Sequence, residues 1–290
     1  MRIDAHHHLW DLSAVHYPWL MEHGAPRFFG DPTPIQRDYL VPEFQQDAQP
    51  HGIDASVHIQ VGAADAWAEA TWVQSVADAT PGWPAAQVVF CDLTRDDLNE
   101  QLDRYLTLPS VRGVRQIVGR APGEDAQTGT NDLLNNPQFA AGLRAAGARG
   151  LSFDLQLLPE LMGQMVRVLD QAPDTPVALC HAGSPHDRSA AGLAAWRSHL
   201  APLAERQQVT CKLSGLGMFD HGWSVASIRP IVETCLELFG ADRCMFGSNF
   251  PVDSLSSDYA TLFNAYEALV PEPDQRSVFG GTAAHFYRLV

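Results

Sequence analysis

Short apolar runs recur eight times along the chain, and stretches with helical periodicity separate them. The runs begin near Arg2, Ala55, Gln87, Val111, Leu151, Val177, Val209 and Cys244. Nearly continuous apolar runs are typical of strands that are covered on both faces. Alternation of strand and helix predicts a parallel sheet under a helical layer. Eight such units predict the α/β class and, within it, a closed (β/α)8 TIM barrel.

Helices are expected between these runs. Residues 66–79 place Trp67, Ala70 and Val73 at helical spacing. The other predicted helices cover residues 96–106, 139–148, 159–172, 190–205, 225–239 and 258–269. Ser224 or Ser227 is suited to cap the helix that begins near residue 225.

An open, doubly wound sheet is the competing fold, and the turn after the first run argues against it. Such a sheet usually has a glycine-rich phosphate turn there, whereas this chain reads His6-His7-His8-Leu9-Trp10. No low-complexity linker divides the 290 residues, so a single domain over residues 1–290 is expected. The longest insert, residues 10–52, is predicted to be a lid over the catalytic end. Residues 119–137 are predicted to form a mobile flap.

The composition excludes several classes of partner. With 46% hydrophobic and 18% charged residues the chain is globular, and 19 basic against 34 acidic residues give a net charge of −15. Such a surface repels phosphate backbones and anionic membranes, so neither nucleic acid nor a membrane is an expected partner. The five cysteines form no CxxC motif and lie mainly in apolar runs. Together with the absence of a visible signal peptide, they predict buried free thiols in a cytoplasmic protein.

Polar residues stand at or near the end of almost every predicted strand, where barrel enzymes hold their active sites. In chain order they are His6 and His8, His58 and Gln60, Asp92, Arg115 and Gln116, Asp154 and Gln156, His181, Lys212 and Ser214, and Asn249 with Asp253. An inert apolar scaffold has no need for ionisable groups at so many strand ends. The pattern therefore predicts an enzyme pocket.

The first of these strand ends is the best candidate for a metal site. His6 and His8 are two residues apart, so on a strand they point to the same side, and His7 faces the helix layer. Two neighbouring imidazoles can chelate a divalent ion such as zinc. A polar strand end with solvated histidines is the simpler alternative, but a further histidine, His181, at another strand end favours a site.

The remaining candidates each have more than one interpretation. Arg115 can hold a substrate carboxylate bidentately, or it can form an ion pair inside the barrel with Asp154 or Asp92. Lys212 lies within an apolar strand, so it either lines the pocket or bonds a carboxylate. Trp10 is either the floor of the pocket or part of the core. His181 is a metal ligand, a general acid or a substrate donor, unless it only holds a loop carbonyl.

Several short motifs together resemble those of the amidohydrolase superfamily, and within it the "amidohydrolase 2" group of sugar lactonases and pyrone dicarboxylate hydrolases. The motifs are residues 4–8 (DAHHH), 113–115 (GVR), 153–155 (FDL), 181–183 (HAG), 212–215 (KLSG) and 246–252 (FGSNFPV). The resemblance runs from Ile3 to about Phe286. It implies a distorted TIM barrel, with His6 and His8 as the strand-one metal or substrate pair and His181 as the strand-six histidine.

Two departures from the family pattern bear on the chemistry. Binuclear members bridge their metals with a lysine or glutamate on strand four and add a histidine on strand five, but this chain has Arg115, Gln116 and Asp154 in those strands. At most one divalent metal, such as zinc, is therefore expected, and the pattern is also compatible with metal-free operation. The family's strand-eight aspartate, which activates water, is replaced by Asn249. An amide is not a general base, so that role passes to Asp253, Asp154 or a histidine.

The predicted function is hydrolysis of a small lactone of a sugar acid or of a carboxylated ring compound. His181, Asn249, Asp253 and Lys212 are the predicted catalytic residues, and His6 and His8 the metal ligands. The predicted substrate-binding residues are Trp10, His58, Gln60, Arg115, Gln116 and Asp154. Two alternatives remain open: a metal-free lactone isomerase or decarboxylase, and a non-catalytic sugar-acid binding protein. The expected partner is a small, anionic substrate, and the pattern leaves a homo-oligomer open.

Overall fold

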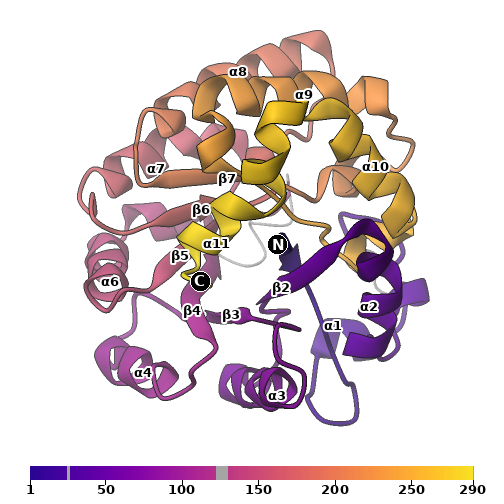
Figure 1. Cartoon of the computed structure of the whole chain (residues 1–290). Coiled ribbons are helices and arrows are strands. Elements are labelled where there is room, and N and C mark those ends of the chain that lie inside the picture. Colours follow the sequence, from indigo (N-terminus) through magenta and orange to yellow (C-terminus); the bar gives the residue numbers. More distant parts are fainter. Residues whose placement is uncertain (25–26, 122–129, 290) are drawn as a thin grey trace.

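The computed structural model, which describes residues 1–24, 27–121 and 130–289, is a barrel of parallel strands within a ring of helices (Figure 1). The strands are β1 (Arg2–His7), β2 (Ile53–Ile59), β3 (Ala86–Phe90), β4 (Val111–Ile117), β5 (Ser152–Gln156), β6 (Val177–Leu179), β7 (Val209–Leu213) and β8 (Cys244–Phe246). They pair in sequence order, and every pair is parallel. The predicted fold class and all eight predicted strands are confirmed.

The last strand returns to the first and nearly closes the barrel. Beyond β8, the Asn249 N–H donates to His6 O at 2.7 Å, and the His8 N–H donates to Phe250 O at 2.7 Å. These bonds draw the polar end of β1 and the polar segment after β8 together. The first and last motifs of the sequence therefore meet at one edge of the barrel mouth.

One main helix follows each strand. They are α2 (Val41–Ala48), α3 (Ala66–Ala79), α4 (Leu98–Tyr105), α6 (Pro137–Ala148), α7 (Met162–Leu169), α8 (Ala190–Ala204), α9 (Val225–Phe239) and α10 (Tyr259–Leu269). Helix α9 begins as expected, because Ser224 and Ser227 form a capping box in which each side chain bonds the other residue's backbone. The apolar faces of the helices pack on the outward side chains of the strands.

The insert at residues 10–52 is more structured than expected, since it contains α1 (Pro18–Met21) and α2. Prolines stand in the first turn of both helices, where no backbone donor is needed. Phe44 of α2 is fully buried, and the His7 ring stacks on it with centroids 4.0 Å apart. The outward His7 thus serves packing against α2.

A short C-terminal helix, α11 (Thr282–Phe286), was not expected from the sequence, and it lies across the end of the barrel where the N-terminus begins (Figure 1). Tyr287 follows it and is fully buried. All five cysteines are free and buried. Among the described residues, no helix combines the length and apolar character needed to cross a bilayer.

Candidate active site at the mouth of the barrel

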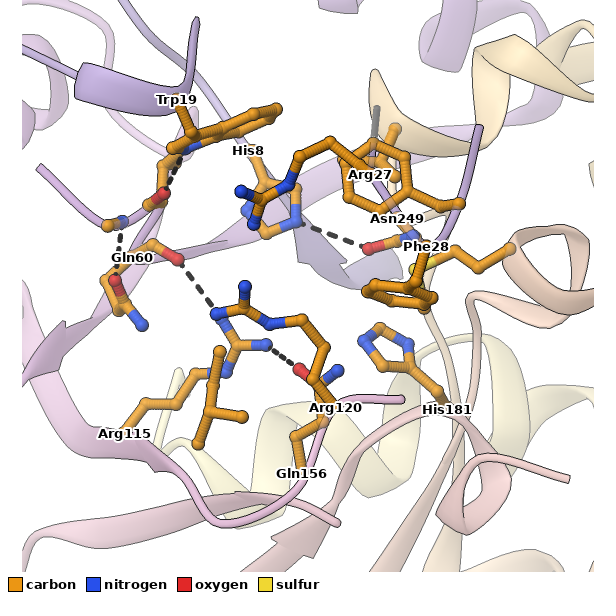
Figure 2. Close-up of a pocket in the computed structure, with 16 residues that line it drawn as sticks. His8, Trp19, Arg27, Phe28, Gln60, Arg115, Arg120, Gln156, His181 and Asn249 are labelled. Atoms are coloured by element: carbon orange, nitrogen blue, oxygen red, sulfur yellow. Dashed lines mark hydrogen bonds between the residues drawn. The ribbon is translucent and has the colours of Figure 1, made fainter. Parts of the chain in front are cut away.

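A cavity of about 180 Å³ opens at the carboxyl ends of the strands (Figure 2). Its lining comes from strand ends and from the insert at 10–52. The lining residues are His8, Trp19, Arg27, Phe28, Phe29, Gln60, Val61, Gly62, Arg115, Ile117, Arg120, Gln156, His181, Met218, Asn249 and Val252. Aromatic rings of the insert thus face polar groups of the barrel.

Two histidines of the β1 end approach His181 at the base of this cavity. The ring centroids of His6 and His8 are 5.2 Å apart, and those of His6 and His181 are 4.6 Å apart. Burial lowers the pKa of His6 and of His181 well below the usual value, and it lowers the pKa of His8 to about 4. All three rings are therefore neutral near pH 7, which is the state that accepts protons or binds metal.

His181 is presented by an unusual turn after β6. His181, Ala182, Gly183 and Ser184 have φ values of 56°, 51°, 69° and 54°, so four successive residues are left-handed. Three of them carry a Cβ, and each costs roughly 1–2 kcal/mol in this conformation. The Trp196 indole N–H donates to Ala182 O at 2.8 Å and holds the turn. Strain of this kind typically persists where it places a functional group.

The end of β7 orients the His181 ring. Ser214 Oγ lies 3.3 Å from the His181 backbone N–H, which donates to it, and 3.0 Å from Nδ1. The Ser214 hydroxyl is then available to donate to Nδ1, which leaves the ring proton on Nε2. At Gly215, where φ is +63°, an added Cβ would overlap the His181 ring.

Asn249 joins His8 to a buried carboxyl group. Its Nδ2 donates to Asp253 Oδ1 at 2.9 Å, and its Oδ1 lies 3.2 Å from His8 Nε2. His8 Nδ1 lies 2.8 Å from Ile59 O. Both contacts have an oxygen acceptor, so a neutral ring can donate to only one of them. The shorter contact, to Ile59 O, favours a proton on Nδ1, which leaves Nε2 as an acceptor beside Asn249 Oδ1. Two acceptors, His8 Nε2 and Asn249 Oδ1, thus face each other at the cavity wall. Burial raises the pKa of Asp253 to about 7.

Arg115 of β4 is held by residues at the ends of β2 and β5, with its guanidinium at the cavity (Figure 2). One Nη donates to Gln60 O at 3.2 Å, and the other donates to Gln156 Oε1. Neither partner is charged, so the positive charge of Arg115 is left for a ligand. The buried ion pair with Asp154 or Asp92 that the sequence left open is not formed.

Lys212 bonds a carboxylate beneath the cavity. Its Nζ donates to Asp154 Oδ2 at 2.5 Å and to Ala5 O at 2.8 Å, and it lies 3.5 Å from His6 Nδ1. The Tyr287 hydroxyl also donates to Asp154, at 2.9 Å. Lys212 and Asp154 are fully buried and do not line the cavity. Of the interpretations open for Lys212, the structure has the one in which it bonds a carboxylate.

Besides Asp154, three predicted substrate-binding residues do not reach the cavity. Trp10 is a core residue whose Nε1 donates to Arg37 O at 2.6 Å. The Gln116 amide turns outward, where its oxygen accepts from Leu93 N and its nitrogen donates to Asp92, because alternate residues of a strand face opposite sides. His58 lies on the helix side of β2, where its Nδ1 accepts from the Leu9 N–H at 3.3 Å.

The cavity also contains residues that were not among the sequence candidates. Trp19, Arg27, Phe28 and Phe29 come from the insert, and Arg120 follows β4. The aromatic content of residues 10–52 was the available signal, but nothing in the sequence orients an individual loop side chain. Of the predicted flap at 119–137, residues 122–129 lie outside the described residues.

Two sets of side chains offer donor atoms for a metal ion. Donor atoms of His6, Asp154 and Cys180 lie within 4.8 Å of one another. There the Lys212 ammonium already bonds Asp154, and burial raises the pKa of Cys180 to about 11, so the thiol keeps its proton. His6 and His8 fit better, because their rings are neutral and His6 Nε2 is buried without a hydrogen-bond partner in the described part of the chain.

Comparison with known proteins covers nearly the whole chain. The family model described as "Amidohydrolase" matches residues 3–289. The "Uncharacterized protein y4mH" of Sinorhizobium fredii is 36% identical over 99% of this chain and 98% of its own length. An L-fucono-1,5-lactonase of Burkholderia ambifaria is 26% identical over 99% and 96%, respectively. The crystal structure of an amidohydrolase from Burkholderia multivorans with bound zinc has a TM-score of 0.85, 25% identity and full coverage of both chains.

Proposed function

The chain belongs to the amidohydrolase family and is a hydrolase, and from that premise we propose that it opens a small, anionic lactone. The observation that carries the proposal is the buried charge of Arg115. Its guanidinium lines the cavity, and its two hydrogen-bond partners, Gln60 O and Gln156 Oε1, are uncharged. In a chain of net charge −15, a buried cation held at a cavity by neutral groups is best explained by a carboxylated ligand. The Burkholderia lactonase supports a lactone as the reacting group.

The hydrogen-bond donor at the base of the cavity, His181, indicates where the carbonyl group of the lactone binds. With Ser214 bonded to Nδ1, His181 presents an Nε2–H to the cavity. A neutral imidazole donor suits the oxyanion that forms when the carbonyl is attacked, because it stabilises developing charge without a proton transfer. Arg115 then holds a carboxylate of the substrate, and the rings of Trp19 and Phe28 cover it.

The two facing acceptors at the cavity wall are suited to hold the attacking water. Water can donate one hydrogen to His8 Nε2 and the other to Asn249 Oδ1, which leaves an oxygen lone pair for the carbonyl carbon. His8 takes the first proton as the C–O bond forms. The new imidazolium is stabilised through Asn249, whose Nδ2 remains on Asp253. The ring C–O bond then breaks, and the leaving oxygen takes the proton from His8, which yields a hydroxy acid.

This assignment gives Asn249 a role that does not require a basic side chain. Asp154 is not the base in this proposal, because Lys212 and Tyr287 already bond its carboxylate. Asp253 acts through Asn249 because it does not line the cavity. If a divalent ion is bound, His6 and His8 are the residues that would hold it, and it would polarise the lactone carbonyl. His8 Nε2 would then be a ligand to the ion and would not act as the base.

A matched pair of lactones tests the function. We expect acid release from 2-pyrone-4,6-dicarboxylate with a kcat/KM at least about 10-fold above that for the uncharged L-fucono-1,5-lactone, since one charge-assisted contact is worth about 1.5–3 kcal/mol. Arg115→Met should remove most of this preference. Equal turnover of both lactones, or preference for the neutral one, contradicts an anionic substrate. No acid release from any lactone contradicts hydrolysis.

One observation favours a second candidate, a lactone isomerase or decarboxylase. Asn249 stands where a water-activating aspartate is expected from the family resemblance, and isomerisation consumes no water. NMR of the products separates the two reactions, because an isomer keeps its ring, whereas hydrolysis yields an open hydroxy acid. Thermal stabilisation by a lactone without any turnover would instead indicate the binding protein.

Metal content is expected not to exceed one divalent ion per chain. The strand ends that would complete a binuclear site are occupied by Arg115, which repels a second cation, and by Asp154, which is paired with Lys212. Elemental analysis of protein purified without chelator measures the ratio directly. A ratio near two zinc ions per chain would show that the Lys212–Asp154 pair opens.

A further inference from the structure

The helix layer beside the cavity contains a buried carboxylate that the proposed chemistry does not use. We propose that Glu69 of α3 is a positioning residue, which fixes the turn at residues 60–64 and thereby aims Arg115 and docks the insert that carries Trp19. The effect on substrate binding rests on the proposed function. The effect on the insert rests on the geometry alone.

Burial makes the position of Glu69 energetically unfavourable for a carboxylate. Its residue exposure is 3%, although it belongs to the first turn of a helix on the outside of the barrel. The nearby His58 ring, whose Nε2 lies 3.8 Å from Oε1, is neutral near pH 7 because burial lowers its pKa to about 3, so it supplies no compensating charge. A buried carboxyl group is retained when its hydrogen bonds are needed. The Glu69 Oε1 atom accepts from the Val61 N–H at 2.7 Å.

That single bond orients a peptide that faces the cavity. In a planar trans peptide, the N–H of Val61 and the C=O of Gln60 point in opposite directions. When Glu69 holds the N–H from the helix side, Gln60 O must point toward the barrel. There it accepts from Arg115 at 3.2 Å. The helix carboxylate therefore determines the acceptor that aims the Arg115 guanidinium.

The same turn also contacts the insert at residues 10–52. Val61 O accepts from the Trp19 indole N–H at 2.8 Å (Figure 2), and the Ala64 N–H donates to His16 O at 2.9 Å. The Gly62 N–H donates to Gln60 Oε1 at 2.7 Å, which closes the turn. A turn whose peptide plane is free to rotate would lose both the lid contact and the arginine contact.

His58 joins this arrangement to the catalytic strand end. Because its Nδ1 accepts from the Leu9 N–H, the ring proton is on Nε2, the atom directed at Glu69. Leu9 follows His8 directly. The bond from Leu9 to His58 thus ties the end of β1 to β2, and Glu69 lies 3.8 Å beyond the ring, which gives His58 a positioning role rather than contact with substrate.

A matched variant separates positioning from mere stability. Gln74 lies on the same helix with 9% exposure, and its Oε1 accepts from Ser110 N at 2.9 Å and Ser110 Oγ at 2.7 Å, at the start of β4. Gln74→Met therefore removes a comparable buried acceptor far from the turn. Glu69→Met removes the acceptor at the turn, and Glu69→Gln retains an amide oxygen that can accept from Val61.

Hydrogen exchange of the full chain gives the first readout. Glu69→Met should speed amide exchange in residues 13–24 by about 10-fold relative to wild type, with Glu69→Gln close to wild type and Gln74→Met unchanged there. Equal exchange in residues 13–24 of both Met variants would overturn the proposal. This readout needs no substrate, so it decides the role of Glu69 even if no lactone is hydrolysed.

Kinetics on 2-pyrone-4,6-dicarboxylate give the second readout. Glu69→Met should raise KM about 10-fold with a smaller change in kcat. The reason is that the Glu69–Val61 bond orients Arg115, which binds the carboxylate of the substrate. Glu69→Gln should restore most of the loss. A fall in kcat alone, or the same KM change in Gln74→Met, would contradict a positioning role.

Discussion

Lys212→Met is expected to lower the free energy of unfolding by about 3–5 kcal/mol, because it leaves the Asp154 carboxylate buried without its cation. Lys212 and Asp154 are both fully buried, and their 2.5 Å bond is supported by the Tyr287 hydroxyl. Tyr287 alone cannot replace a positive charge in this position. Urea denaturation followed by far-UV circular dichroism measures the change.

Two controls make this result specific. Arg197→Met breaks the exposed Arg197–Glu237 pair, which has equally short contacts, and should cost less than about 1 kcal/mol. Adding Asp154→Asn to Lys212→Met removes the stranded charge and should recover part of the loss. If Lys212→Met lowers the free energy of unfolding no more than Arg197→Met does, the buried Lys212–Asp154 pair does not stabilise the barrel as proposed.

His181→Ala is expected to reduce kcat for lactone hydrolysis by roughly 10²–10³-fold, as loss of an oxyanion donor does elsewhere. KM should change little, since the carboxylate of the substrate is held by Arg115. Steady-state kinetics with 2-pyrone-4,6-dicarboxylate check both constants, and near-UV circular dichroism checks that the fold is retained.

His186→Ala is the matched control for His181. His186 lies five residues further along, is partly exposed and pairs with Glu160 at 3.1 Å, outside the cavity. Its loss should leave kcat within about 2-fold of wild type, in line with a surface substitution away from the site. A comparable loss of activity in both variants would place the effect in the β6–α8 segment as a whole and not in the His181 ring.

The order and type of the main elements could be predicted because they follow from local patterns. The apolar runs at Val177 and Val209 became β6 and β7, and residues 66–79 became α3 with the predicted bounds. The short helix α2 was missed since its two turns lie within a proline-rich insert. Helix α11 was missed because five residues carry too weak a periodic signal.

The candidate site was predictable only to the level of strand ends. Because strands alternate their faces, the sequence could name Arg115 and Gln116 together, but only Arg115 faces the cavity. His6 and His8 share a face as expected from their spacing. By contrast, Trp19 and Arg27 reach the cavity from a long insert whose path is set by contacts with distant residues such as Val61.

The sequence by itself determined the barrel, the positions of its strands and the set of polar strand ends, because each depends on the periodicity of nearby residues. Only the tertiary structure decided which of those groups are paired and which are left for a ligand. Lys212 pairs with Asp154, which lies 58 residues away in the sequence, and this pair stabilises the barrel beneath the cavity. Arg115 has no such charged partner among the described residues, so its charge is available to a ligand in the cavity. That division depends on distances between strands, and a linear pattern contains no such distances.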